Sequence, residues 1–179
     1  MEMNRRAPDT LCVLLLLVVF GHGQSVLHLN RCTALAESSV EAITTKPTNW
    51  QRILDSSRDY LSECADILQT KTQARLLDDI GWALIEQDEH MDAIPVLKRC
   101  VAVDPDYALC WYRLGRASEG IGRRFDAKAF WRKTIDIGGT DKFNALAVKM
   151  ARDSLNLLLT REKLLGDRLP PDPSAPQSV

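Results

Sequence analysis

An internal repeat with a period of 34 residues constrains the fold of this 179-residue chain more than any other feature. Segment 111–131 (WYRLGRASEGIGRRFDAKAFW) repeats segment 77–97 (LDDIGWALIEQDEHMDAIPVL) at that offset. The pairs of identical residues are Gly81 with Gly115, Ala83 with Ala117, Asp92 with Asp126 and Ala93 with Ala127. A repeat of this length is typical of a supersecondary unit that stacks on its own copy.

Each copy divides into two predicted helices joined by a turn. In the first copy Asp88-Glu89-His90 fills the turn, and Asp104-Pro105-Asp106 closes the second helix. In the second copy Gly120 and Gly122 interrupt the helical spacing of apolar residues. A glycine inside a helix costs about 1 kcal/mol relative to alanine. The glycine that the two copies share therefore predicts a neighbouring helix that packs closely against it.

The repeat resembles that of the tetratricopeptide repeat (TPR) family, whose helix–turn–helix units are about 34 residues long. The residues that follow the family's spacing are Trp111, Leu114, Gly115, Gly122, Ala127 and Trp131 in the second copy and Gly81, Ala93, Leu97 and Pro105 in the first. The match covers residues 74–139, and Leu77, Ser118 and Gly139 depart from it. The resemblance implies an all-α fold, a short helical solenoid with two TPR-like helix–turn–helix repeats over 71–139.

The segments on either side of the repeats are predicted to close the ends of the solenoid, since stacked repeats need polar caps. Residues 24–70 form the expected N-terminal helical hairpin, with one helix over 26–43 and a second from Trp50 to near Thr70. Residues 140–166 form the expected C-terminal capping helix. The proline-rich tail, 167–179, is expected to be disordered.

The N-terminus has the charge and hydropathy order of a secretory signal peptide over residues 1–23. Arg5 and Arg6 precede ten apolar residues (11–20), and Gly21-His22-Gly23 follows. Ten residues rise about 15 Å as a helix, whereas a bilayer core is about 30 Å thick. The sequence thus predicts cleavage near Gly23, export to a periplasm and no membrane span in the mature chain. An uncleaved signal anchor and a eukaryotic secretory route stay open as alternatives.

Four cysteines follow the predicted cleavage site, and an even number favours disulfides in an exported chain. Their spacing matches no zinc site. The resemblance places the helices that carry Cys100 and Cys110 side by side, which implies a bond between them. Cys32 and Cys64 would then close the N-terminal hairpin, although the other two pairings stay open.

Little in the sequence indicates catalysis, and no cofactor or metal site is expected. The mature histidines lie outside any nucleophile motif. The adjacent carboxyls of Asp78 and Asp79 are interpreted as part of a solvated helix face. The formal net charge of −1 argues against a general nucleic-acid binder.

The resemblance implies a protein or peptide partner held in a concave groove between the inner helices. The groove positions carried over from the family are Arg75, Asp78, Trp82, Ile85, Leu109, Tyr112, Arg116 and Glu119. Trp82 and Tyr112 are expected as rigid anchors and Arg116 as a hydrogen-bond donor. In the alternative interpretation, Trp82 is half-buried against the N-terminal hairpin. The predicted function is an exported interaction module without catalysis; an inhibitor or immunity protein is the alternative, and the oligomeric state stays open.

Overall fold

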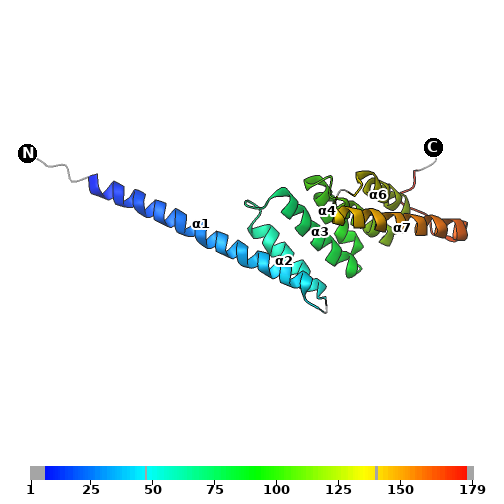
Figure 1. Cartoon of the computed structure of the whole chain (residues 1–179), viewed down its shortest axis with the longest axis horizontal. Helices are drawn as coiled ribbons and strands as arrows, with labels where there is room; N and C mark the ends of the chain where they lie inside the picture. The colour runs from blue at the N-terminus through cyan, green and yellow to red at the C-terminus, as the bar shows by residue number, and fades with distance from the viewer. Residues whose placement is uncertain (1–6, 47, 140, 177–179) are drawn as a thin grey trace, which may run out of the picture.

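The computed structural model describes residues 7–46, 48–139 and 141–176, with the backbone alone for 7–25 and 167. In these ranges the regular secondary structure is entirely helical (Figure 1). The described helices are α1 (Ala7–Thr44), α2 (Trp50–Glu63), α3 (Thr70–Glu86), α4 (His90–Val103), α5 (Ala108–Gly120), α6 (Arg124–Ile137), α7 (Lys142–Leu165) and the short 3₁₀-helix η1 (Gly166–Arg168). The predicted all-α fold is confirmed.

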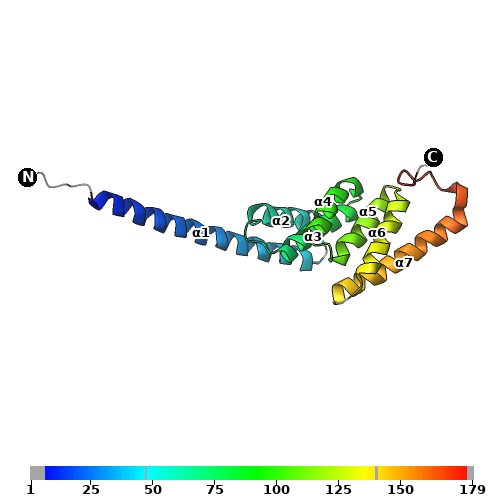
Figure 2. The same ribbon diagram turned by 90° about the horizontal axis from the view of Figure 1, so that it is seen from above.

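Consecutive helices pack against each other along the whole of this series, from α1 on α2 to α6 on α7. Helix α5 also contacts α3 on one side and α7 on the other, so the odd-numbered helices form one layer of the stack. Figure 2 shows the hairpins following one another in a row. The arrangement is the short helical solenoid that the repeat predicted.

The two sequence copies form the hairpins α3–α4 and α5–α6, and their equivalent glycines have the same role. A Cβ atom on Gly81 would lie 2.5 Å from Cδ2 of Leu97, and one on Gly115 would collide with the ring of Trp131. Leu97 and Trp131 are both 0% exposed. Each glycine therefore admits a large side chain from the second helix of its hairpin, which confirms the close approach predicted from the sequence.

The four cysteines that the structure describes form two disulfide bonds. Cys32 on α1 pairs with Cys64, which follows α2, with a Cα–Cα distance of 5.9 Å. Cys100 on α4 pairs with Cys110 on α5, with a Cα–Cα distance of 6.1 Å. The first bond closes the N-terminal hairpin and the second joins the two repeats, in the pairing that the sequence interpretation favoured.

The N-terminal hairpin differs from its prediction in the bounds of both helices. Helix α1 begins at Ala7 rather than near Val26, and its first part extends away from the other helices in both views (Figures 1 and 2). Helix α2 ends at Glu63 rather than near Thr70, because the backbone turns at Cys64, whose carbonyl accepts the N–H groups of residues 67 and 68.

The predicted signal peptide stays a prediction, since the side chains of residues 1–23 lie outside those that the structure describes. In the part of the chain with described side chains, no helix is both long enough and apolar enough to cross a membrane.

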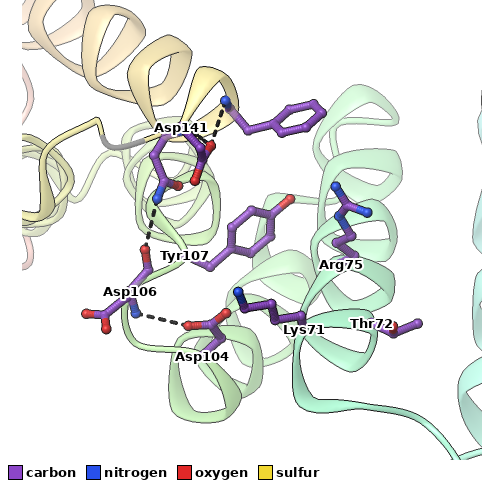
Figure 3. Close-up of a pocket in the computed structure, with 9 residues that line it drawn as sticks. Lys71, Thr72, Arg75, Asp104, Asp106, Tyr107 and Asp141 are labelled. Atoms are coloured by element: carbon purple, nitrogen blue, oxygen red, sulfur yellow. Dashed lines mark hydrogen bonds between the residues drawn. The ribbon is translucent and has the colours of Figure 1, made fainter.

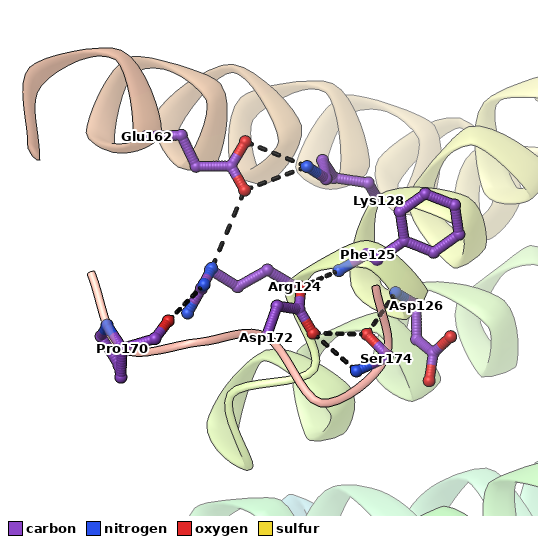
Figure 4. Close-up of polar contacts among 8 residues, drawn as sticks. All are labelled: Arg124, Phe125, Asp126, Lys128, Glu162, Pro170, Asp172 and Ser174. Carbon is purple, nitrogen blue, oxygen red and sulfur yellow. Dashed lines mark hydrogen bonds and ion pairs between the residues drawn. The ribbon is translucent and has the colours of Figure 1, made fainter. Parts of the chain in front are cut away.

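The C-terminal tail is ordered where disorder was expected. Three tail groups hold the start of α6 (Figure 4). The carbonyl of Pro170 accepts a hydrogen bond from Arg124 at 2.6 Å, and Asp172 Oδ2 accepts the N–H of Phe125 at 2.7 Å. The hydroxyl of Ser174 accepts the next N–H, that of residue 126, at 3.2 Å. Residues 170–174 thus contact the start of α6 where the sequence predicted an unpacked tail, while 177–179 lie outside the described ranges.

Candidate partner-binding surface

A pocket of about 510 Å³ opens between the start of α3, the α4–α5 connection and the start of α7. Its lining residues are Lys71, Thr72, Arg75, Asp104, Asp106, Tyr107, Asp141, Phe143 and Asn144. Figure 3 shows the residues of the three segments around the pocket, with the ring of Tyr107 at the centre. The pocket lies at the N-terminal ends of α3 and α7, beside the connection that leads into α5.

The wall formed by α7 is fixed by a short chain of hydrogen bonds. Asp141 Oδ1 accepts the N–H groups of Phe143 at 2.8 Å and Asn144 at 2.9 Å, so it caps the first turn of the helix. The amide of Asn144 then accepts the N–H of Ala108 at 3.1 Å and donates to the carbonyl of Asp106 at 3.3 Å. The α4–α5 connection and α7 are thereby held as one rigid edge of the pocket.

Two cations approach the exposed ring of Phe143 in this pocket. The guanidinium of Arg75 lies 5.4 Å from the ring centroid, and the ammonium of Lys142 lies 5.2 Å from it. The ring is 43% exposed, and both cations are exposed as well. Neither forms an ion pair with a carboxylate in the described ranges. An exposed aromatic ring with two cations beside it is therefore available to a partner.

Beneath the pocket, a buried ionic cluster joins α3 to α5. Arg113 donates to Asp78 Oδ2 at 2.6 Å and to the backbone carbonyl of Asp78 at 2.9 Å. The hydroxyl of Tyr107 donates to the same carboxylate at 3.3 Å. Asp78 is 2% exposed and Asp79 is partly buried, so the interpretation of these two carboxyls as a solvated face is wrong.

This burial changes the protonation of the cluster. Burial raises the pKa of Asp78, although the charge of Arg113 opposes this effect. Burial, together with the negative charge of Asp78, raises the pKa of Asp79 to about 7. Burial also raises the pKa of the Tyr107 hydroxyl, and the neighbouring charge of Asp78 adds to this increase. The cluster stabilises the junction between the repeats, and its carboxyls are not presented to a ligand.

Trp82 lies against the N-terminal hairpin, as in the alternative interpretation. Its ring meets that of Trp50 from α2 edge to face, with centroids 4.8 Å apart. The guanidinium of Arg113 lies 4.7 Å from the centroid of Trp82, and the indole N–H donates to Glu86 at 3.3 Å. Trp82 is half-buried among these groups, so most of its surface contacts other parts of this chain.

The structure separates the remaining predicted groove residues into two groups. Ile85, Leu109 and Tyr112 are buried, at 3%, 8% and 7% exposure, and like Asp78 they belong to the interior. These side chains are therefore not accessible to a partner in this structure. The groove residues that stay partly or fully exposed are Arg75, Arg116 and Glu119. Arg116 pairs with Glu86 at 3.3 Å, and Arg75 belongs to the pocket of Figure 3.

Sequence reasoning missed Arg113 and the contributions of Lys71 and Phe143. One signal for Arg113 was present, because a shift of 34 residues aligns it with Asp79. Equivalent positions of adjacent repeats stack side by side, so the opposite charges of residues 79 and 113 indicate an attraction across the junction. The carboxylate that Arg113 binds is that of the preceding residue, Asp78. Phe143 lies outside the repeats and had no such signal.

Among the side chains that the structure describes, no group of three or more His, Cys, Asp or Glu residues is arranged to hold a metal ion. No known protein-family model matches the chain. The evidence for a function therefore comes from this surface itself.

Proposed function

We propose that the chain is an exported, TPR-like interaction module that binds a segment of another protein on its inner layer, without catalysis. The pocket of about 510 Å³ in Figure 3 carries this proposal. It is walled by three separate segments, and its edge at α7 is held rigid by Asp141 and Asn144. A preformed concave surface lowers the ordering cost of binding.

The side chains at the pocket suit a peptide better than a small metabolite. Lys71 and Arg75 lie one helical turn apart on α3, and Asp104, Asp106 and Asp141 line the other walls of the pocket. A peptide backbone and mixed side chains can satisfy both signs of charge, with the Phe143 ring as an apolar contact. Export is supported by the two disulfide bonds, which form and persist in oxidising compartments.

The test is affinity capture from an extract of the protein's own source with the oxidised chain as bait. A Lys71→Glu/Arg75→Glu variant is compared with Lys98→Glu/Lys133→Glu, which reverses two exposed charges on α4 and α6. We expect the captured partner to be lost with the first variant and kept with the second. Both variants are checked for native helix content by circular dichroism. A partner that both variants retain would place the binding surface away from this pocket.

A further inference from the structure

Helix α7 has a second apolar stripe that the rest of the described chain leaves uncovered. One side of the helix is buried in the solenoid through Asn144, Ala147, Val148, Ala151 and Leu158. On another side Phe143, Leu146, Leu157 and Leu164 are 43%, 51%, 70% and 76% exposed. Positions 143, 150, 157 and 164 are seven residues apart and all apolar, with the half-buried Met150 among them. Residues at this spacing share one side of a helix, so the stripe extends about 30 Å.

The charges beside this stripe are mostly positive. Lys142 and Lys149 lie one helical heptad apart along its edge, and Arg161 lies within it. All three are exposed, and none forms an ion pair with a described carboxylate. Asp153 is the acidic residue nearest to the stripe in the helical spacing. The other carboxylate of α7, Glu162, is already bound by Lys128 at 3.0 Å on the buried side (Figure 4).

A hollow of about 350 Å³ lies in the stripe near the C-terminal end of α7. It lies among Leu157, Leu158, Leu164 and Leu165, with Glu119 of α5 at its edge. An apolar side chain of a partner can insert there, in the manner of the buried anchors that dominate binding energy in helix-in-groove complexes.

The charge pattern selects among the possible occupants. A second copy of the chain carries only Asp153 as an acidic residue beside this stripe, so it offers few partners for Lys142, Lys149 and Arg161. An anionic bilayer would be attracted by the lysines but repelled by Asp104, Asp106 and Asp141 in the adjoining pocket. A helix of another protein, in contrast, can carry acidic residues opposite Lys142 and Lys149 alone, without approaching the carboxylates of the pocket.

We propose that the exposed stripe of α7 docks an amphipathic helix of another protein, with its apolar side on Phe143, Met150, Leu157 and Leu164. Acidic residues along the edge of that helix pair with Lys142 and Lys149. This site goes beyond the proposed pocket, because Leu157 and Leu164 lie two to three heptads along α7 from the pocket edge at Phe143.

The probe is a synthetic helical peptide of about three heptads with leucine at the a and d positions and glutamate at the flanking positions. Its matched partner has lysine in place of every glutamate. Binding of each labelled peptide to the full oxidised chain is measured by fluorescence anisotropy. We expect the acidic peptide to bind at least about tenfold more tightly than the basic one. Equal affinity for the two peptides, or binding of neither, would overturn the proposal.

Two variants locate the site. Leu157→Ser/Leu164→Ser removes two exposed apolar side chains and should weaken the acidic peptide by about tenfold or more. Leu159→Ser is the control, since Leu159 is 42% exposed on a different side of α7 and should leave binding unchanged. Lys142→Glu/Lys149→Glu should reverse the preference between the peptides. If Leu159→Ser weakens binding of the acidic peptide as much as Leu157→Ser/Leu164→Ser does, the peptide does not bind at the stripe.

Two further measurements address the other occupants. Co-sedimentation with vesicles of phosphatidylcholine, with and without phosphatidylserine, reports membrane binding. Analytical ultracentrifugation reports self-association. We expect a monomer that stays in the supernatant. If the chain binds vesicles and Leu157→Ser/Leu164→Ser abolishes this binding, the occupant of the stripe is a bilayer. If the chain dimerises and the same variant is monomeric, the occupant is a second copy. We expect the pocket variant Lys71→Glu/Arg75→Glu to leave peptide binding to α7 unchanged, so the failure of one proposal can be told from the failure of the other.

Discussion

Arg113 of α5 and Asp78 of α3 form an ion pair in the interior, with 2.6 Å between Nη1 and Oδ2. Their side chains are only 13% and 3% exposed. The same guanidinium lies over the ring of Trp82, which in turn contacts Trp50 of α2. One side chain from the second repeat thus contacts the first repeat and, through Trp82, the N-terminal hairpin. A buried ion pair therefore helps to hold the two repeats together.

Arg113→Leu is expected to lower the free energy of unfolding by about 3–5 kcal/mol, because it leaves the Asp78 carboxyl buried without its cation. The double variant Asp78→Leu/Arg113→Leu should lose less than the single one, since it removes both charges. Urea unfolding followed by circular dichroism measures the double variant and both single variants, Arg113→Leu and Asp78→Leu. If the double variant is as unstable as the sum of the two single variants, the two residues are not coupled.

Asp79 gives the free energy of unfolding a pH dependence with a definite sign. Burial and the charge of Asp78 raise its pKa from 3.8 to about 7, so in this range the folded chain binds the proton more tightly than the unfolded chain. The free energy of unfolding should therefore fall as the pH rises from about 4 to about 7. Asp79→Asn removes this titration and should be more stable than the parent by about 1–2 kcal/mol near pH 8, with the difference vanishing near pH 4.

Urea titrations at several pH values test this expectation. Asp136→Asn, at an exposed position on α6, is the matched control and should follow the parent. The same pH dependence in Asp79→Asn and in the parent would show that another group controls the stability in this range.

The repeat made most of the fold predictable. Gly81 and Gly115, which are equivalent in the two copies, indicated the helix packing that the structure shows against Leu97 and Trp131. The TPR resemblance implied the bond between Cys100 and Cys110, while the sequence left the other pairings open. The repeat itself is periodic, and a single sequence displays it directly.

The candidate site was less predictable, because its residues are defined by contacts between segments far apart in the chain. Adjacent carboxyls such as Asp78 and Asp79 usually face solvent, and only the position of Arg113 on the next repeat makes their burial possible. The tail has no apolar pattern of its own. Its order comes from Asp172, which caps a helix some 47 residues earlier in the sequence, and no local motif marks such a contact.

Gly115→Ala is expected to destabilise the protein although alanine favours helices. The new methyl group would collide with Trp131, which is fully buried and whose indole N–H is hydrogen-bonded to the Tyr112 carbonyl at 3.1 Å. Overpacking of this kind costs about 1–3 kcal/mol. Gly120→Ala is the control, because its methyl group meets the ring of His90, whose side chain is 21% exposed and can move outward. Thermal unfolding should rank Gly115→Ala well below Gly120→Ala, and the opposite order would contradict the packing.

Asp172→Ala is expected to loosen the start of α6. The helix has no side-chain cap from its own preceding residue, and Asp172 accepts the N–H of Phe125 instead, at 2.7 Å. Burial alone would raise the pKa of Asp172, but hydrogen bonds from Ser174 and Phe125 outweigh it and hold the pKa below its ordinary value. The carboxylate therefore stabilises the fold above that ordinary pKa and loses this effect as the pH falls below it.

Removing this cap should cost about 1 kcal/mol, while Asp172→Asn, which keeps an acceptor, should cost less. Amide hydrogen exchange resolves the effect by residue. We expect faster exchange at Phe125 and Asp126 in the alanine variant and little change at Phe143, where Asp141 caps α7 independently. Unchanged protection at Phe125 would mean that the tail does not hold α6 in solution, and the order of residues 170–174 would then have no energetic consequence for the solenoid.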